Sequence, residues 1–263
     1  MMKKSIVAVL LLFIFLPIVL LGGWIFKVAF LLVGVLGLKE IIDLQKHHKK
    51  IPLFIVFLSF LLFVLYVLNI ENRYYSYGIS EQKNALLVLF LFLPCLFYGK
   101  ESYTTHEAMY LSGSILFLGT SFSSILFIRE YDIWLFWYLV LVPIVTDIIA
   151  MQIGRLFGKH KCAPLISPNK TWEGAIAGTI VSVVVSSLFY SSFVQEIPIV
   201  LLVCITFLLS VIGQFGDLVF SKIKRENEIK DFSQIIPGHG GILDRIDSIL
   251  FVVLVYVLLF GVL

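Results

Sequence analysis

The sequence predicts an all-α polytopic membrane protein, and three observations carry that prediction. Of its 263 residues, 60% are apolar and 14% are charged, whereas about a quarter of the residues are charged in soluble globular proteins. The mean hydropathy is +1.02. Apolar runs of roughly 17–25 residues recur, and a helix of that length crosses the hydrocarbon core of a bilayer, about 30 Å thick. The chain therefore falls outside the soluble globular class.

Nine transmembrane helices are expected, and no soluble linker domain, internal repeat or low-complexity tract interrupts them. We place them at residues 5–21, 24–43, 51–69, 85–98, 111–128, 133–153, 174–193, 197–219 and 248–263. No small-x-small cleavage site follows the first apolar run, so it is interpreted as an uncleaved span rather than a secretory signal. The chain is interpreted as one integral-membrane domain over 1–263, with N-terminal helices in 1–130 and a motif-bearing half in 131–263.

The cationic residues predict the orientation, because cytoplasmic connections are enriched in lysine and arginine. With the N-terminus in the cytoplasm, 16 of the 20 lysines and arginines lie in inside segments and four lie in outside connections. The N-terminus is therefore expected inside and, after nine spans, the C-terminus outside. The same orientation places the connections 154–173 and 221–247 together on the cytoplasmic side of an inner or plasma membrane.

The most polar stretch of the chain is 221–247. It contains a Pro-Gly-His-Gly-Gly turn and five cations: Lys222, Lys224, Arg225, Lys230 and Arg245. Glycines on both sides of His239 allow positive φ angles and can direct backbone N–H groups toward a phosphate; the alternative is an ordinary turn. Asp244 and Asp247 share a helix face if the last helix begins near Leu243. Cations, a glycine turn and paired carboxylates suit a site for phosphates and a divalent cation.

Two further carboxylates are expected at a similar membrane depth. Asp147 lies within the sixth span, where a charged group costs about 2.5–3.5 kcal/mol at mid-membrane, so it should face a protein interior, a cavity or a cation. Asp217 ends the sequence Gly-Gln-Phe-Gly-Asp at the close of the eighth span. The alternatives are a helix-end carboxylate at the interface for Asp147 and a purely structural role for Asp217. Converging carboxylates fit a hard cation such as Mg²⁺, which takes oxygen ligands.

A second anion site is expected where the seventh helix opens. Ser167 is interpreted as its N-cap and Pro168 as its first helical residue. A helix N-terminus pointing into the cytoplasm, with Lys170 in its first turn, would attract an anion. Trp172 is interpreted as an interface anchor rather than a platform for base stacking.

Residues 221–247 resemble the signature of the phosphatidate cytidylyltransferase (CDP-diacylglycerol synthase) family. That pattern reads Ser-x-apolar-Lys-Arg, four residues, Lys-Asp, then Pro-x-His-Gly-Gly-apolar-x-Asp-Arg-apolar-Asp. It is filled here by Ser221, Ile223, Lys224, Arg225, Lys230, Asp231, Pro237, His239, Gly240, Gly241, Ile242, Asp244, Arg245, Ile246 and Asp247. The segment 167–174 resembles the family's Ser-Pro-Lys-Lys-Thr-x-Glu-Gly motif, with Asn169 in place of a lysine. Gly216 and Asp217 match a Gly-Asp pair, whereas the residues after Asp147 depart from the family's Asp-Thr-Gly-Ala-Tyr.

The resemblance implies that CTP and phosphatidic acid give CDP-diacylglycerol and pyrophosphate at the bilayer, with Mg²⁺ required. It implies Asp217 and Asp244 as the principal metal ligands, helped by Asp147 and Asp247. The residues expected at the CTP phosphates or the lipid headgroup are Ser167, Lys170, Lys224, Arg225, Lys230, His239, Gly240, Gly241 and Arg245. Nucleic acid is not an expected partner. A second cation and a homodimer are left open.

Two other functions remain open from the residues. A polyprenol kinase-like enzyme would also use CTP, but it would transfer the γ-phosphoryl group and release CDP instead of pyrophosphate. An ion-coupled transporter would also place carboxylates within the membrane. Transport, however, gives no ready reason for the array of cations, glycines and carboxylates in 221–247.

Overall fold

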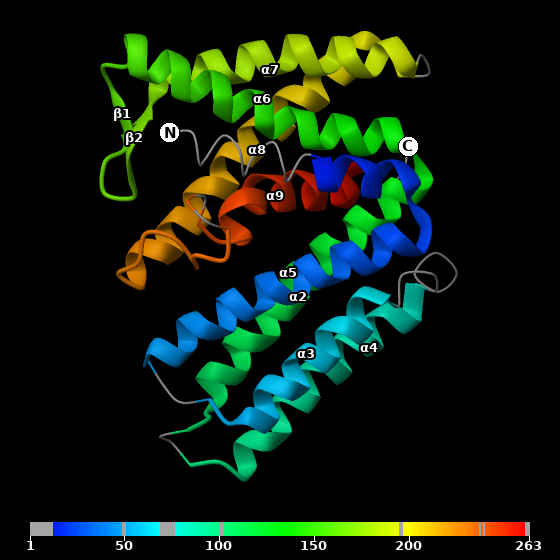
Figure 1. Cartoon of the computed structure of the whole chain (residues 1–263), viewed down its shortest axis with the longest axis vertical. Coiled ribbons are helices and arrows are strands. Elements are labelled where there is room, and N and C mark those ends of the chain that lie inside the picture. The colour runs from blue at the N-terminus through cyan, green and yellow to red at the C-terminus, as the bar shows by residue number, and fades with distance from the viewer. Residues whose placement is uncertain are drawn as a thin grey trace. The chain divides into compact units, whose positions relative to one another are not determined.

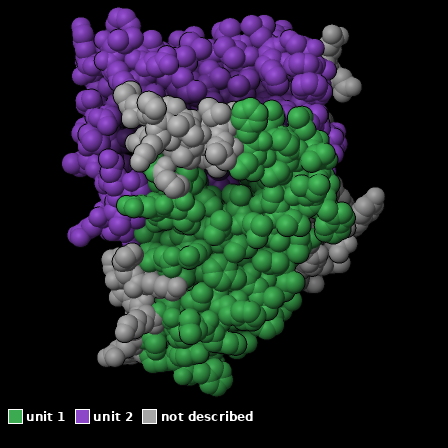
Figure 2. All heavy atoms as spheres, viewed as in Figure 1, with its two compact units in different colours: residues 1–127, 232–243 green, residues 128–231, 244–263 purple. Residues whose placement is uncertain are grey.

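The computed structural model describes most of the chain (Figure 1). The residues that it describes are 13–48, 51–68, 77–99, 102–194, 197–236, 238 and 240–260. The chain divides into two compact units, shown in green and purple in Figure 2. Unit 1 comprises Met1–Phe127 and Phe232–Leu243, and unit 2 comprises Ile128–Asp231 and Asp244–Leu263.

Helices form the described part of unit 1. Residues 13–21 are helical, and they are followed by α2 (Gly23–His48), α3 (Leu53–Leu68), α4 (Tyr77–Phe92), the short 3₁₀ helix η1 (Leu93–Leu96) and α5 (Thr105–Tyr131), whose last turn belongs to unit 2. Gly34 of α2 lies against Phe63 of α3 and Phe122 of α5, since a Cβ at Gly34 would come within 2.8 Å and 3.2 Å of those rings. The two rings meet edge to face, with 6.2 Å between their centroids. The absence of a side chain at Gly34 thus lets three helices share one core.

Unit 2 combines long helices with a small hairpin. Its elements are α6 (Ile133–Phe157), β1 (Lys161–Ala163), β2 (Ser167–Thr171), α7 (Trp172–Phe193), α8 (Ile199–Glu226) and α9 (Leu243–Phe260), whose first residue belongs to unit 1. The backbones of α6 and α7 approach closely, because a Cβ at Gly174 would lie 2.4 Å from the carbonyl oxygen of Ala150, and one at Gly178 would lie 2.6 Å from that of Thr146. Small residues permit such packing between membrane helices.

The protein is a helical membrane protein, as its composition predicts. Within the described residues, four helices are long and apolar enough to cross a bilayer: α5, α6, α7 and α8. The number of spans and the side on which each terminus lies stay predictions. The β1–β2 hairpin was not expected; it is antiparallel, with Lys161 opposite Thr171 and Ala163 opposite Ser167.

Both ends of the stretch 221–247, which the sequence predicts to be a connection between two spans, are helical. Helix α8 continues to Glu226, seven residues beyond its expected end, and α9 begins at Leu243, five residues before its expected start at residue 248. The earlier start meets the condition under which Asp244 and Asp247 share a helix face. The extension of α8 is supported by an i,i+4 ion pair of 3.6 Å between Lys222 and Glu226 and by cations in its last turn, which favour the negative end of the helix dipole. Lys224 and Arg225 are therefore presented by a helix and not by an irregular connection.

Candidate active site

Three helices of unit 2 carry the four predicted carboxylates. Asp147 lies on α6, Asp217 on α8, and Asp244 and Asp247 on α9. The charges of Asp147, Asp217 and Asp247 act on one another electrostatically. Ser248 contacts two of the four, because its hydroxyl donates to Asp147 Oδ2 at 3.3 Å and its backbone N–H donates to Asp247 Oδ1 at 2.8 Å. The fold thus brings Asp147 and Asp247, which are a hundred residues apart in the sequence, into contact with the same serine.

The hairpin contributes a lysine to this group of carboxylates. Lys170 of β2 places its Nζ 2.6 Å from Asp217 Oδ2, and both side chains are about one quarter exposed. The same ammonium lies 3.5 Å from the carbonyl oxygen of Gln214, and Ser221 donates its hydroxyl to Asp217 Oδ1 at 3.3 Å. Asp217 is therefore held by a cation and a hydroxyl from two different elements.

The expected opening of the seventh helix at Ser167 is wrong. Ser167–Thr171 is the strand β2, and α7 begins at Trp172. Its N-cap is Thr171, whose extended backbone (φ −127°, ψ 152°) lets the hydroxyl accept a 3.2 Å hydrogen bond from the N–H of Gly174. Pro168, which lacks an N–H donor, is tolerated at the edge of a sheet. Lys170 consequently lies before the helix, where its side chain reaches Asp217 instead of forming an anion site in a first helical turn.

A second lysine–aspartate pair joins α8 to α9. Lys224 Nζ lies 2.6 Å from Asp244 Oδ1, and the two side chains are only 10% and 5% exposed. Because both side chains are enclosed, water screens their charges less than it screens the charges of an exposed pair. The neighbouring Arg225 is exposed and donates to two backbone carbonyls, those of Ile166 in the hairpin at 3.2 Å and Ile229 at 2.9 Å. Arg225 thus ties the hairpin to the end of α8.

The glycine turn belongs to unit 1 and is described by itself. Gly238 and Gly240 have positive φ angles of 76° and 83°, as the sequence predicts. The N–H of Ile236 donates to the carbonyl oxygen of Gly240 at 3.0 Å, which closes the turn. His239 lies outside the described residues. Lys230 and Arg245 of unit 2 are exposed.

The donor set in unit 2 suits a hard divalent cation, since carboxylate and hydroxyl oxygens are the ligands that Mg²⁺ takes. Asp217 and Asp244, however, each share an oxygen with a lysine ammonium. Among the described residues, no three His, Cys, Asp or Glu side chains converge as a metal centre would require. The chemistry of the donors therefore fits Mg²⁺. To bind the cation, Asp217 or Asp244 would have to separate from the lysine that it contacts, Lys170 or Lys224.

Comparison with known proteins identifies the family of this chain. The sequence pattern of the "Cytidylyltransferase family" matches residues 2–263. The chain belongs to the cytidylyltransferase family. Relatives named phosphatidate cytidylyltransferase are 36% identical over 255 residues in Staphylococcus haemolyticus and 34% identical over 258 residues in Bacillus subtilis. These alignments cover 96% of this chain and 96% and 94% of the two relatives, so the similarity includes both units.

Two polar residues outside the predicted site, Gln214 and Glu40, were not identified from the sequence. Gln214 of α8 donates its amide to Thr179 Oγ1 of α7 at 2.8 Å, one turn before Asp217. Glu40 of α2 is 2% exposed, yet it was not singled out as Asp147 was. The signal for Glu40 was available, because it is a carboxylate within an expected membrane span. Its partners lie some two hundred residues away in the sequence, and only the fold identifies them.

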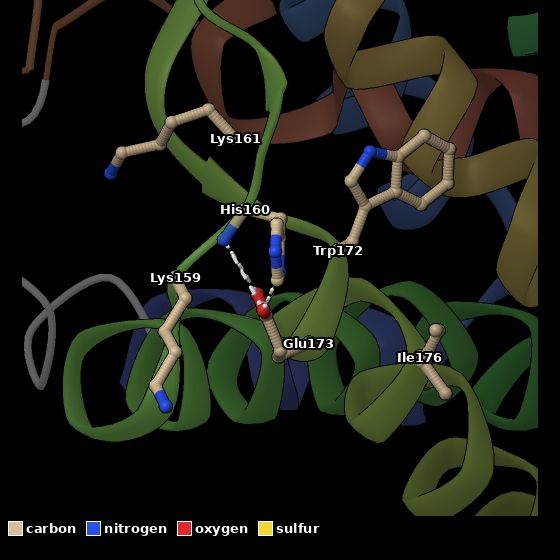
Figure 3. Close-up of a pocket in the computed structure, with 6 residues that line it drawn as sticks. All are labelled: Lys159, His160, Lys161, Trp172, Glu173 and Ile176. Atoms are coloured by element: carbon tan, nitrogen blue, oxygen red, sulfur yellow. Dashed lines mark hydrogen bonds and ion pairs between the residues drawn. The ribbon is translucent and has the colours of Figure 1, made fainter.

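A pocket of about 730 Å³ opens beside the hairpin in unit 2 (Figure 3). It is lined by Lys159, His160, Lys161, Trp172, Glu173 and Ile176. His160 and Glu173 point toward each other, with 2.6 Å between Nδ1 and Oε1. Cys162 lies next to this lining on β1, and burial raises the pKa of its thiol, which lowers its reactivity. The pocket lies on the hairpin that positions Lys170, and none of its lining residues belongs to the four carboxylates.

Proposed function

We propose that this protein is a phosphatidate cytidylyltransferase that converts CTP and phosphatidic acid into CDP-diacylglycerol and pyrophosphate. The observation that carries the proposal is the similarity to relatives of that name over 96% of the chain. The pairing of lysines with carboxylates in unit 2 supports it, because a nucleotide and a phospholipid both present phosphates. The polyprenol kinase-like and transporter alternatives have no comparable support.

The reaction places particular demands on the side chains. A phosphate oxygen of phosphatidic acid attacks the α-phosphorus of CTP, and the bond from that phosphorus to the bridging oxygen of the β-phosphate breaks, which releases pyrophosphate. A phosphate monoester already carries about −1.5 to −2 charge at pH 7, so the nucleophile needs no general base. What the protein must supply is neutralisation of charge and alignment of two anions.

Lysines and aspartates of unit 2 suit that task. Lys170 and Lys224 are held by Asp217 and Asp244 at 2.6 Å, so each ammonium is oriented before substrate arrives. We assign these lysines to the substrate phosphates, together with Ser167, Arg225, Lys230, His239, Gly240, Gly241 and Arg245. The aspartates, with help from Asp147 and Asp247, would hold Mg²⁺, which would screen the phosphates of CTP.

The proposal includes an orientation in the membrane. The apolar runs predict nine spans, and the excess of lysine and arginine in the inside segments predicts a cytoplasmic N-terminus and, with nine spans, an outside C-terminus. This orientation would turn the site toward the cytoplasm. Phosphatidic acid would enter from the bilayer. Every residue assigned to the site belongs to this one chain, which is interpreted as one integral-membrane domain.

The test is an assay of the purified protein in detergent with CTP and phosphatidic acid. Label from CTP is expected in chloroform-soluble lipid with equimolar pyrophosphate, and chelation of Mg²⁺ should abolish it reversibly. Asp217→Asn and Asp244→Asn should each lose about 100-fold or more in kcat. Glu226→Gln, which changes an exposed carboxylate on the same helix as Asp217, is the matched control.

Three results would count against parts of this proposal. Full activity of both asparagine variants would remove Asp217 and Asp244 from the metal site. Release of CDP would indicate a kinase. Proton-dependent flux without turnover of CTP would indicate a transporter.

A further inference from the structure

Glu40 is a buried carboxylate in unit 1 that binds a segment distant in the sequence. It lies on α2, and 2% of the residue is exposed. Its Oε1 accepts hydrogen bonds from the hydroxyl of Ser233 at 2.6 Å and from the N–H of Ile242 at 2.8 Å, and its Oε2 accepts one from the N–H of Leu243 at 2.9 Å. All these residues belong to unit 1. One side chain therefore holds both ends of the segment 233–243.

The contacts of Glu40 have the chemistry of a helix cap. Helix α9 begins at Leu243, and the first N–H groups of a helix have no partner within it. A carboxylate that accepts from them also stabilises the positive end of the helix dipole. Glu40 thus acts as an N-cap supplied by another helix instead of by the preceding residue.

The glycine at position 241 makes this approach sterically feasible. A Cβ there would lie 2.5 Å from Glu40 Oε1, so any side chain would displace the carboxylate. Gly37, one turn earlier on α2, likewise faces the side chain of Leu243, which a Cβ would approach to 3.1 Å. The face of α2 that bears Gly37 and Glu40 therefore fits against the start of α9.

The segment that Glu40 holds carries residues of the proposed site. Between Ser233 and Ile242 lies the turn in which Gly238 and Gly240 adopt positive φ angles. Asp244 directly follows Leu243 and pairs with Lys224 at 2.6 Å. If Ile242 and Leu243 lost their fixed positions, the glycine turn before them and Asp244 after them would therefore be less well positioned.

We propose that Glu40 is a positioning residue of the transferase, which orients the glycine turn and Asp244 by binding Ser233 and the first amides of α9. The role rests on the proposed function, because it concerns the same site. Glu40 itself does not contact substrate. It acts through the backbone of the segment 233–243.

The experiment compares Glu40→Gln with a matched variant, Glu107→Gln. Glu107 is also a buried carboxylate of unit 1, 6% exposed, and it accepts from the N–H of Thr104 at 2.7 Å at the start of α5. Both substitutions put an amide where donors converge, so both should lower the Tm of the protein in detergent. Only Glu40→Gln should lower kcat at saturating substrates, by about 10- to 100-fold, as small misplacements of reacting groups do.

Hydrogen exchange of the full-length protein provides a readout that does not depend on activity. Peptides covering 233–245 should exchange faster in Glu40→Gln than in the wild type, and those in Glu107→Gln should not. Ser233→Ala, which removes one of three hydrogen bonds, should show a smaller change of the same kind and serves if Glu40→Gln does not fold.

Two outcomes would overturn the inference: unchanged exchange over 233–245, or a kcat for Glu40→Gln equal to that of Glu107→Gln at a similar loss of Tm. A wild type that forms no CDP-diacylglycerol would refute the proposed function instead, and the exchange experiment would still test whether Glu40 holds the segment.

Discussion

Lys224 and Asp244 form a well-enclosed ion pair, with side chains 10% and 5% exposed. Lys222, two residues earlier, pairs with Glu226 at 3.6 Å with both side chains 62% exposed. The same type of residue on the same helix thus occupies two opposite environments. Water screens the charges of the exposed pair, whereas burial makes each partner of the enclosed pair depend on the other.

At the scale of the residue, we predict that Lys224→Met lowers the free energy of unfolding by about 3–5 kcal/mol, because it removes the cation that lies 2.6 Å from the buried carboxylate of Asp244. Lys222→Met should change it by less than about 1 kcal/mol. Unfolding by titration with sodium dodecyl sulfate measures both variants. Equal effects of the two substitutions would contradict the burial of the Lys224–Asp244 pair.

At the scale of the element, close packing of α6 and α7 depends on glycine. A Cβ at Gly178 would lie 2.6 Å from the carbonyl oxygen of Thr146 and 3.2 Å from the backbone N of Ala150. Backbone atoms cannot rotate away as a flexible side chain can, so the helices themselves must move. Thr146 also forms a hydrogen bond of 2.8 Å with Ser210 of α8, which would be disturbed if α6 moved.

We predict that Gly178→Ala destabilises the protein by about 1–3 kcal/mol through overpacking. The control is Gly113→Ala on α5, where a Cβ meets nothing within 4 Å and alanine should be neutral or stabilising by up to about 1 kcal/mol. The same detergent titration measures both. A stabilising effect of Gly178→Ala would show that α6 and α7 do not pack as closely as described.

At the scale of the whole molecule, the orientation of the chain is open to a direct test. In a background in which Cys95, Cys162 and Cys204 are replaced by serine, single cysteines are introduced as Leu165→Cys in the hairpin, 92% exposed, and Tyr131→Cys at the end of α5, 56% exposed. The positive-inside rule places the first in the cytoplasm and the second outside.

A membrane-impermeant maleimide applied to intact cells should therefore label Tyr131→Cys and should label Leu165→Cys only after the membrane is permeabilised. Activity of each cysteine variant in the CTP assay shows that the fold is retained. The reverse pattern of labelling would invert the proposed orientation, and labelling of both positions in intact cells would refute an odd number of spans between them.

Prediction from sequence succeeded where the signal lies along the chain. The positive φ angles at Gly238 and Gly240 follow from the glycine content of the turn. It failed at Ser167, because Ser-Pro is typical of a helix start and the competing strand depends on pairing with Lys161–Ala163. It also ended α8 too early, because hydropathy marks where apolar residues stop and a helix can continue beyond them.

The sequence by itself determined that the chain is a helical membrane protein, and its motifs identified the family and predicted a site that contains four aspartates. These properties reside in composition and in short spacings, which need no knowledge of packing. Only the tertiary structure decided which lysine neutralises which aspartate, that Thr171 caps α7, and that Glu40 caps α9. Each of those contacts depends on how helices and the hairpin pack, and a linear pattern does not encode which distant residues will meet.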